Sequence, residues 1–199
     1  MKLFSSLLNE DYFKSLSDRL KDANDEKSLK SAVVNAPFQS PATSVAIGLG
    51  IVVLLVESPD KKTLNRVALS NTEQAHGATK TSVKRFSDIK IPMKDENNIL
   101  VKALHTGDWQ QTSDWTDLFT PALTSEEAKF NQAGAGIGCS IVYPISTKAG
   151  KGALIFSYFI HPSEITKRHH TFMKKYSRMV TKSLGGTETS TIFSRLNKI

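Results

Sequence analysis

Two tryptophans and a few small polar residues form the segment best suited to bind a small molecule. Trp109 and Trp115 flank Thr112 and Asp114. Indole rings around a few hydrogen-bonding groups are typical of ligand pockets, which are mostly apolar with a small number of placed polar groups. The same indoles are equally good packing residues, so a pocket wall and a core wall are both open at this point. With one residue from each of two late apolar stretches, the candidate ligand-binding residues are Trp109, Thr112, Asp114, Trp115, Tyr143 and Ser157.

No combination of residues in the sequence indicates a catalytic or metal site. Cys139 lies in an apolar stretch, where burial raises the pKa of a thiol and makes it inert, so we predict a packing role, with a redox role as the alternative. His169 and His170 are adjacent, so on a helix they point about 100° apart and cannot chelate as an i, i+4 pair does. The sequence also lacks a nucleophile elbow and a catalytic pair of acids. We therefore predict no catalytic residue, no metal site and no enzyme activity, and the sequence identifies no cofactor.

The composition predicts one globular domain in a reducing compartment. The chain has 199 residues, 39% of them hydrophobic, and a mean hydropathy of −0.25. The charge-free stretch of residues 44–56 ends at Glu57 after thirteen residues, which is fewer than the roughly 20 apolar residues of a membrane helix. The N-terminus lacks a secretory signal pattern, and the single cysteine excludes an internal disulfide framework. We therefore expect a cytoplasmic protein.

The net charge of +7 is concentrated at the C-terminal end. Residues 161–199 contain eight Lys or Arg residues and two acidic residues. A basic end of this kind could bind nucleic acid or an anionic membrane. The alternative is the solvated face of a basic helix, which the lack of an aromatic platform or helix-turn-helix pattern favours. We therefore expect neither nucleic acid nor a membrane as the main partner.

Hydrophobic periodicity and turn residues predict the elements that must position the candidate site. Helices are expected in two segments within 1–36, and at 41–48, 95–107, 124–134 and 162–184. Strands are expected at 51–56, 64–69, 89–91, 137–145 and 153–160. Residues 70–87 and 108–119 are expected to be loop or extended chain. The strand 51–56 has no polar alternation, so it should be covered on both faces. Helices around a largely antiparallel sheet define an α+β fold.

The chain resembles a GAF domain over about residues 20–184. The stretch "GCSIVYPISTKAGKGALIFSYFI" (138–160) is similar to that family's strand, proline, glycine-bearing turn and strand, followed by its long terminal helix. The stretch "NNILVKALHTGDWQQTSDW" (97–115) is similar to the family's helix ending in Thr-Gly with Asp-Trp soon after. The stretch "IVVLLVESPDKKTLNRVAL" (51–69) resembles its first hairpin. The resemblance implies an antiparallel sheet of about six strands between helical layers. One face of the sheet would carry the terminal helices, which often dimerise in this family. The other face would carry a small-molecule pocket.

Three specialised branches of that family are not supported by the residues present. The signature of the cyclic-nucleotide branch is absent. The stretch "RFSDIKIP" (85–92) is similar to the Ser-Asp-Ile-Pro turn of the bilin-binding branch, but Lys90 and Ile91 interrupt that motif. The free-methionine-sulfoxide reductase branch needs at least two cysteines to cycle through a disulfide, and this chain has one.

The sequence thus predicts a stand-alone GAF-like sensory or regulatory module that binds a small molecule or a protein partner. N-terminal helices are expected in residues 1–36, the domain core with its long helix in 37–186, and a short tail in 187–199. We expect a homodimer. The alternatives are a dimerisation scaffold with a degenerate pocket, and a basic surface in residues 161–199 that binds nucleic acid or anionic membrane.

Overall fold

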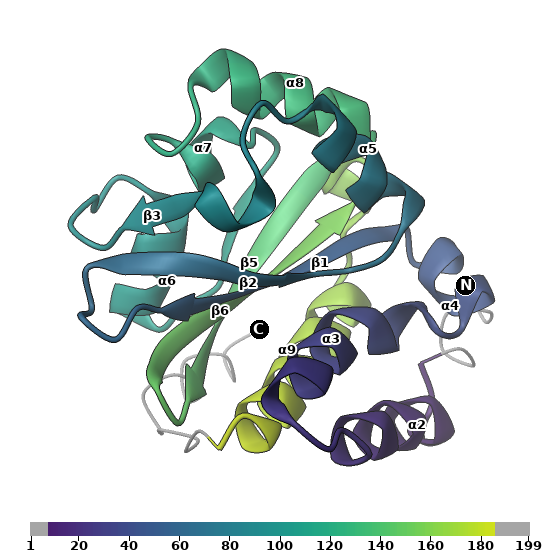
Figure 1. The fold of residues 1–199 in the computed structure, drawn as a ribbon. Helices are drawn as coiled ribbons and strands as arrows, with labels where there is room; N and C mark the ends of the chain where they lie inside the picture. Colours follow the sequence, from purple (N-terminus) through teal and green to yellow (C-terminus); the bar gives the residue numbers. More distant parts are fainter. Residues whose placement is uncertain (1–7, 186–199) are drawn as a thin grey trace.

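The computed structural model describes residues 8–185, which contain one antiparallel sheet of six strands (Figure 1). The strands, in spatial order, are β3 (Lys90–Pro92), β2 (Thr63–Leu69), β1 (Leu49–Glu57), β6 (Gly150–Tyr158), β5 (Cys139–Thr147) and β4 (Gln110–Thr112). Every neighbouring pair is antiparallel. The two long strands β1 and β6 therefore lie at the centre of the sheet.

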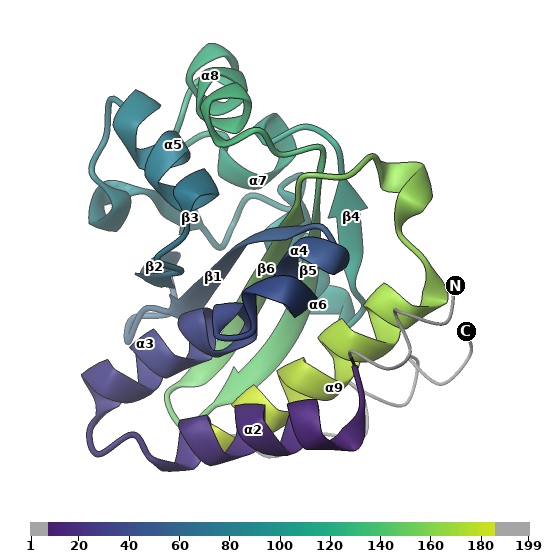
Figure 2. The ribbon, with the colours of Figure 1, turned by 90° about the vertical axis from the view of Figure 1, so that its right-hand side faces the viewer.

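Helices cover both faces of this sheet (Figure 2). The first layer consists of α2 (Glu10–Lys21), α3 (Glu26–Asn35), α4 (Pro41–Ala46) and α9 (Lys167–Ser183). The second layer consists of α5 (Glu73–Thr81), α6 (Ile99–Thr106), α7 (Thr116–Phe119) and α8 (Ser125–Ala135). Short 3₁₀ turns lie at Ala36–Phe38, Phe86–Asp88 and Pro162–Glu164. The predicted α+β architecture, with about six strands between helical layers, is confirmed.

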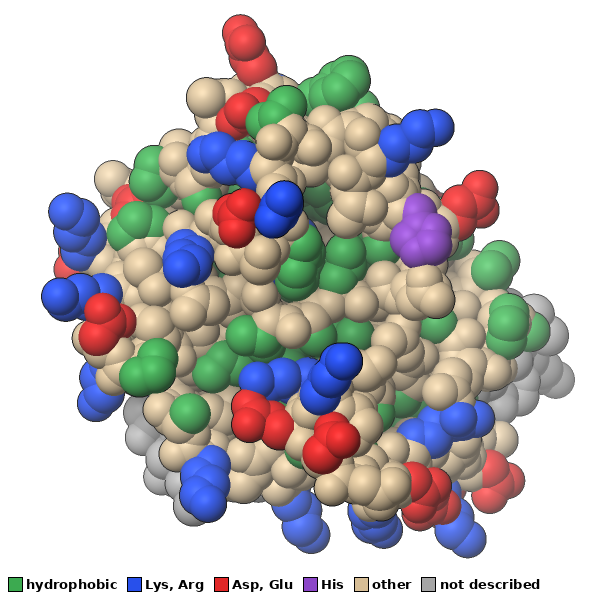
Figure 3. All heavy atoms as spheres, viewed as in Figure 1, with side chains coloured by type: hydrophobic (Ala, Val, Ile, Leu, Met, Phe, Trp, Pro, Cys, Tyr) green, Lys and Arg blue, Asp and Glu red, His purple; other side chains and the backbone are tan. Residues whose placement is uncertain are grey.

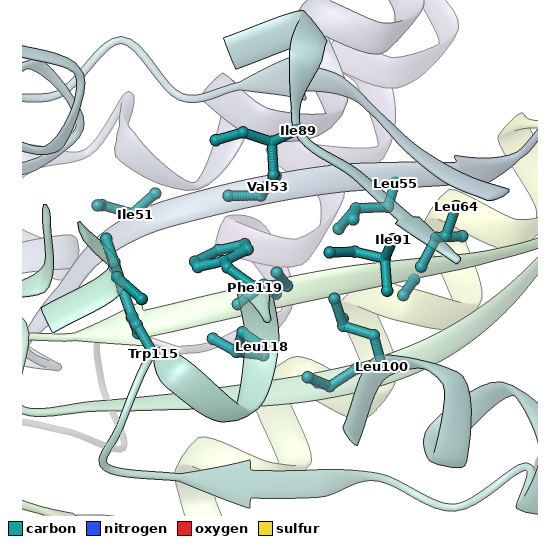
Figure 4. Close-up of a cluster of buried hydrophobic side chains, with 14 of the residues drawn as sticks. Ile51, Val53, Leu55, Leu64, Ile89, Ile91, Leu100, Trp115, Leu118 and Phe119 are labelled. Carbon is teal, nitrogen blue, oxygen red and sulfur yellow. The ribbon is translucent and has the colours of Figure 1, made fainter. Parts of the chain in front are cut away.

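The charge-free strand β1 is buried on both sides because each helical layer forms its own core on the sheet. Ile51, Val53 and Leu55 point into the α7-side core, which also contains residues of α6 and α7 (Figure 4). Val52 and Leu54 point the other way, into the α9-side core. All five are at most 3% exposed. A strand between two cores needs apolar side chains at every position, which explains the lack of alternation.

Local capping signals place several helix ends as the sequence predicts. Thr124 and Glu127 form a capping box at the start of α8, each side chain bonding the other residue's backbone N–H. Gly107 closes α6 with φ 73°, a left-handed conformation that suits glycine. Helix α6 begins later than predicted, because the cap is Asn98 rather than Asp95. The Asn98 side chain is buried and also donates to the carbonyls of Leu118 and Thr120.

Helix α5 lies inside residues 70–87, which were expected to be a loop. The prediction is wrong there because this helix buries small residues, Ala75 and Ala78, that do not signal a core face in a sequence. Its Gly77 meets Gly134 of α8 so closely that a Cβ on Gly77 would lie 2.2 Å from the Gly134 carbonyl oxygen. Residues 108–119 contain β4, which is extended as expected, and α7, a helix too short to show a period in the sequence.

The apolar stripe of α9 packs within this chain. Phe172, Met173 and Val180 are fully buried in the α9-side core, against helices α2 and α3 and the sheet. The stripe therefore has an intramolecular partner, and homodimer formation stays a prediction. Helix α9 begins at Lys167, after a 3₁₀ turn at Pro162 rather than at Pro162 itself.

Part of the basic C-terminal end also packs within the chain. The Lys175 ammonium lies 3.9 Å from the centre of the Phe13 ring, so this charge packs on α2. The predicted tail, residues 187–199, lies outside the described residues, and the division at residues 36 and 186 stays a prediction. None of the helices in residues 8–185 is both long enough and apolar enough to cross a membrane.

The buried centre of β1 gives the first prediction. Val53→Asp should abolish folding, because burying a carboxylate without a partner costs several kcal/mol or more, comparable with a domain stability of roughly 5–15 kcal/mol. Val45→Asp is the matched control, because Val45 is 66% exposed on α4. Urea unfolding followed by circular dichroism measures both variants. A cooperative transition for Val53→Asp at the wild-type midpoint would contradict the two-sided burial of β1.

Candidate functional site

A cavity of about 420 Å³ lies on the α7 side of the sheet. It is bounded by β2, by α5 and the segment after it, by α7 and by α8. In the space-filling view, hydrophobic side chains lie in a hollow near the middle of the face that carries these elements (Figure 3). The lining residues are Arg66, Ala78, Thr79, Ser82, Val83, Lys84, Arg85, Phe86, Ile89, Trp115, Phe119, Leu123 and Asn131.

The inner wall of the cavity is made of core side chains. Trp115 and Phe119 lie side by side (Figure 4), with their ring centres 5.5 Å apart in an edge-to-face arrangement. Both rings and Ile89 are at most 6% exposed and belong to the α7-side core. The wall is therefore part of the hydrophobic core on this side of the sheet.

Arg66 reaches this apolar cavity from strand β2. Its guanidinium carbon lies 4.1 Å from the centre of the Phe86 ring and 5.0 Å from that of Phe119. The Nε atom is buried without a hydrogen-bond partner, and no ion pair holds the group within residues 8–185. Burial lowers the pKa of Arg66 to about 9, so the side chain is still charged at neutral pH.

A β-bulge between β1 and β2 sets the direction of Arg66. Arg66 pairs with Leu55, whereas Ala68 pairs with the preceding residue, Leu54, so Val67 has no partner of its own. Val67 and Ala68 both pack on the α9-side core, while Leu69 packs on the α7-side core. Arg66 therefore shares the cavity face with its strand neighbour Leu64.

Asn131 supplies a second unpartnered polar atom in the same cavity. It lies on α8, is 5% exposed, and its side-chain oxygen has no hydrogen-bond donor within residues 8–185. Most buried polar atoms in native proteins have a partner. The cavity thus carries one buried donor, on Arg66, and one buried acceptor, on Asn131, that a bound molecule could satisfy.

The mouth of the cavity is basic. Lys84 and Arg85 are exposed residues of the segment between α5 and β3, and both line the cavity. The Lys84 ammonium donates to the carbonyl of Ala122 at 2.6 Å, which ties this segment to the turn before α8. The lining contains no acidic residue.

Trp115 lines the cavity, and Ser157 supports it from the sheet. The Trp115 indole N–H donates to Ser140 Oγ at 2.9 Å, and Ser140 Oγ lies 2.7 Å from Ser157 Oγ. Both serines are at most 1% exposed. The backbone N–H of Trp115 also donates to the side chain of Gln132 at 2.8 Å. Ser157 therefore positions Trp115 and is not itself a lining residue.

Thr112 and Asp114 organise the turn that leads into α7. The Thr112 hydroxyl donates to the Asp117 carboxylate, and Thr112 Oγ1 accepts the backbone N–H of Asp114 at 2.9 Å. The Asp114 carboxylate accepts the backbone N–H of Thr116 at 2.8 Å. Hydrogen bonding from Thr116 holds the pKa of Asp114 below its ordinary value. Neither Thr112 nor Asp114 lines the cavity.

Trp109 and Tyr143 lie on the opposite face of the sheet. The Trp109 ring centre is 4.3 Å from that of His170 on α9, and the Tyr143 hydroxyl lies 3.0 Å from His170 Nδ1. Side chains alternate along β5, so Tyr143 enters the α9-side core while Val142 enters the α7-side core. The structure thus separates the predicted residues, and a pocket role for Trp109 or Tyr143 would need a second site.

Sequence reasoning missed Arg66 and Asn131. Arg66 is one polar residue in a half-buried strand, and Asn131 is one polar residue in an amphipathic helix. The only local signal is that Arg66 stands two residues from the buried Leu64, on the same face of a strand.

Cys139 is buried as predicted, and burial raises the pKa of its thiol to about 11. Within residues 8–185 there is no group of three or more metal-binding side chains.

Comparisons with known proteins identify the fold. No family model and no curated protein matches the sequence. A solved GAF domain superposes with a TM-score of 0.57 at 16% identity, covering 90% of this chain and 91% of that one. The GAF domain of Acinetobacter phosphoenolpyruvate-protein phosphotransferase superposes with a TM-score of 0.57 at 6% identity, covering 88% and 91%. The chain therefore has a GAF-like fold.

The prediction that the chain is not an enzyme is wrong, because catalytic proteins share this fold. Free methionine-R-sulfoxide reductase from Neisseria meningitidis, solved with its substrate, superposes with a TM-score of 0.53 at 12% identity, covering 87% of this chain and 88% of that one. Several further matches are reductases of the same kind. The single cysteine argues against their disulfide cycle, but a fold that enzymes use does not exclude catalysis by other residues.

The unpaired charge of Arg66 gives the second prediction. Arg66→Met should raise the free energy of unfolding at neutral pH by about 1–3 kcal/mol, since it removes a buried donor without a partner from a half-buried side chain and keeps an apolar stem between the two rings. Lost cation–π contacts offset part of this gain. Arg85→Met, at the exposed mouth, should change stability by less than about 0.5 kcal/mol.

The gain should also depend on pH. Folding lowers the pKa of Arg66 to about 9, so above pH 9 the unfolded chain binds more protons than the folded one. Wild-type stability therefore recovers as the pH rises past 9, and the advantage of Arg66→Met should shrink. Urea titrations at pH 7 and pH 10 measure both effects. Destabilisation by Arg66→Met at pH 7 would show that Arg66 is a structural residue.

Proposed function

We propose that this GAF-like domain binds a small organic molecule in the cavity between β2, α5, α7 and α8, and acts as a sensory module. The observation that carries the proposal is the pair of buried polar atoms without partners, on Arg66 and Asn131, in one cavity with aromatic walls. A cavity of about 420 Å³ falls in the range that holds drug-sized molecules. A ligand would supply the partners that the protein lacks.

The fixed position of Trp115 supports the proposal. Its indole N–H, its backbone N–H and its ring all have partners, in Ser140, Gln132 and Phe119. Such a wall needs little reordering when a ligand arrives, so little of the binding energy is lost. This is the role we assign to Ser157 and Thr112: they hold the wall in place rather than touch the ligand.

The segment 82–86 is the part of the cavity through which occupancy can be signalled. It links α5 to the 3₁₀ turn before β3, and Val83, Lys84 and Arg85 in it are exposed, Val83 at 71%. A ligand would touch both this outer segment and the packed inner wall. Ordering of the segment on binding would change the surface that a partner meets.

Other parts of the sequence-based prediction stay predictions. These are the homodimer, a protein partner, the cytoplasmic location and the roles of residues 161–199. The scaffold with a degenerate pocket, which was the first alternative, is the outcome that the following experiment would reveal.

A cavity-filling substitution tests the proposal. Ala78 lines the cavity from α5 and is 8% exposed, so Ala78→Phe should occupy the space and abolish ligand binding. Lys80→Phe, on an exposed position of the same helix, is the matched control and should bind as the wild type does. Thermal shift against a metabolite-sized library, with mass spectrometry of small molecules released from purified protein, gives the readout.

Ala78→Val is the control for a loss of binding that is caused by misfolding of Ala78→Phe. It adds less volume than phenylalanine, so it should fold normally and weaken binding only in part. If no compound stabilises the wild type and none is released from it, the protein is a scaffold with a degenerate pocket. If Ala78→Phe binds as tightly as Lys80→Phe, the ligand occupies another place.

A further inference from the structure

We infer that the ligand of this cavity is an organic monoanion, a carboxylate with an aromatic or branched apolar body, and that Arg66 binds its charged group. The inference rests on the proposed function and specifies the chemical class of the ligand.

The charge balance of the cavity calls for an anion. Arg66 is the charged side chain that stands between the aromatic rings, and it has no protein counter-ion within residues 8–185. Arg66 is half-buried, and its Nε atom is buried without a hydrogen-bond partner. An unsatisfied buried donor costs about 1–3 kcal/mol, which an anionic ligand would offset. The lining contains three cationic residues and no acidic residue, so its charged groups repel a cation and attract an anion.

The donor geometry favours a carboxylate over a dianion. A guanidinium presents parallel N–H groups that match the two oxygens of one carboxylate. One carboxylate neutralises one arginine, whereas a phosphate dianion would leave a net negative charge among Phe86, Phe119 and Trp115. Lys84 and Arg85 are exposed at the mouth, where solvent screens them, so they attract an anion but do not balance a second buried charge.

The walls specify the rest of the molecule. Beyond Arg66, the inner surface consists of Phe86, Ile89, Trp115, Phe119 and Leu123. These side chains favour a flat ring or a branched alkyl group, which buries apolar area and stacks on aromatic faces. The unpartnered oxygen of Asn131 adds one acceptor, which a hydroxyl or amine on the ligand could satisfy.

Carboxylates paired with their neutral amides test the assignment. The probes are phenylacetate, indole-3-acetate and 4-methylvalerate, the primary amide of each, and phenyl phosphate. Binding is measured by thermal shift and by the fluorescence of Trp115 in a Trp109→Phe background. Wild-type protein should bind at least one carboxylate on the order of 10- to 100-fold more tightly than its amide, the range expected for a charge-assisted hydrogen-bonded pair. Phenyl phosphate should bind more weakly than phenylacetate.

Variants of Arg66 assign the effect to this side chain. Arg66→Met should remove the preference for carboxylate over amide while leaving the fold intact. Arg66→Lys keeps the charge but loses the planar fork, so it should retain only part of the preference. Lys90→Met removes an exposed cation from the neighbouring strand β3 and should leave the preference unchanged.

Each outcome separates this inference from the proposed function. Equal binding of a carboxylate and its amide would overturn the anion assignment while leaving a ligand-binding cavity in place. A preference that persists in Arg66→Met would overturn the role of Arg66. If the wild type binds no carboxylate in the panel, the ligand class is wrong, and the Ala78→Phe library experiment decides independently whether the cavity binds any small molecule.

Discussion

The structure depends on one constraint: its long central strands must satisfy two hydrophobic cores at once. Side chains of β1, β5 and β6 alternate between the α9-side core and the α7-side core. A shift of one residue in any strand would exchange its two sets of side chains, so the register is strongly specified. The same register places Ser140 and Ser157 behind Trp115, and Tyr143 and Cys139 on the far side of the sheet.

Polar groups on the α7 side fall into two kinds, and the difference separates support from function. Ser140, Ser157 and the Trp115 indole satisfy one another, so they add rigidity without an unpaired group. Arg66, Asn131 and the hydroxyls of Thr116 and Thr120 at α7 have buried polar atoms without partners, and of these four residues Arg66 and Asn131 line the cavity. Each unpartnered group costs free energy, and for the two groups that line the cavity a bound ligand would offset that cost. Such sites are expected where stability is exchanged for binding.

The outer wall of the cavity depends on a close contact between two helices. Gly77 of α5 and Gly134 of α8 allow the two backbones to meet, and the Thr81 hydroxyl of α5 bonds back to the Gly77 carbonyl. Any larger residue at Gly77 would collide with the backbone of α8. This contact fixes the end of α5, and with it the start of the segment 82–86 that forms the mouth of the cavity.

The sequence by itself determined the sheet, the long helix and the fold class. The unbroken apolar run around Val52 and Val53 predicted a strand between two cores. Local chemistry marked helix ends, through the capping residue Thr124 and through Gly107. The sequence also indicated Trp115 as a candidate pocket residue, and Trp115 lines the cavity. The tertiary structure alone decided which predicted residues meet, because Trp109 and Tyr143 look like pocket residues until the strand register assigns them to the other face. Arg66 and Asn131 could be identified as candidate binding residues only from the tertiary structure. A missing hydrogen-bond partner is a property of three-dimensional contacts, which the order of residues does not show.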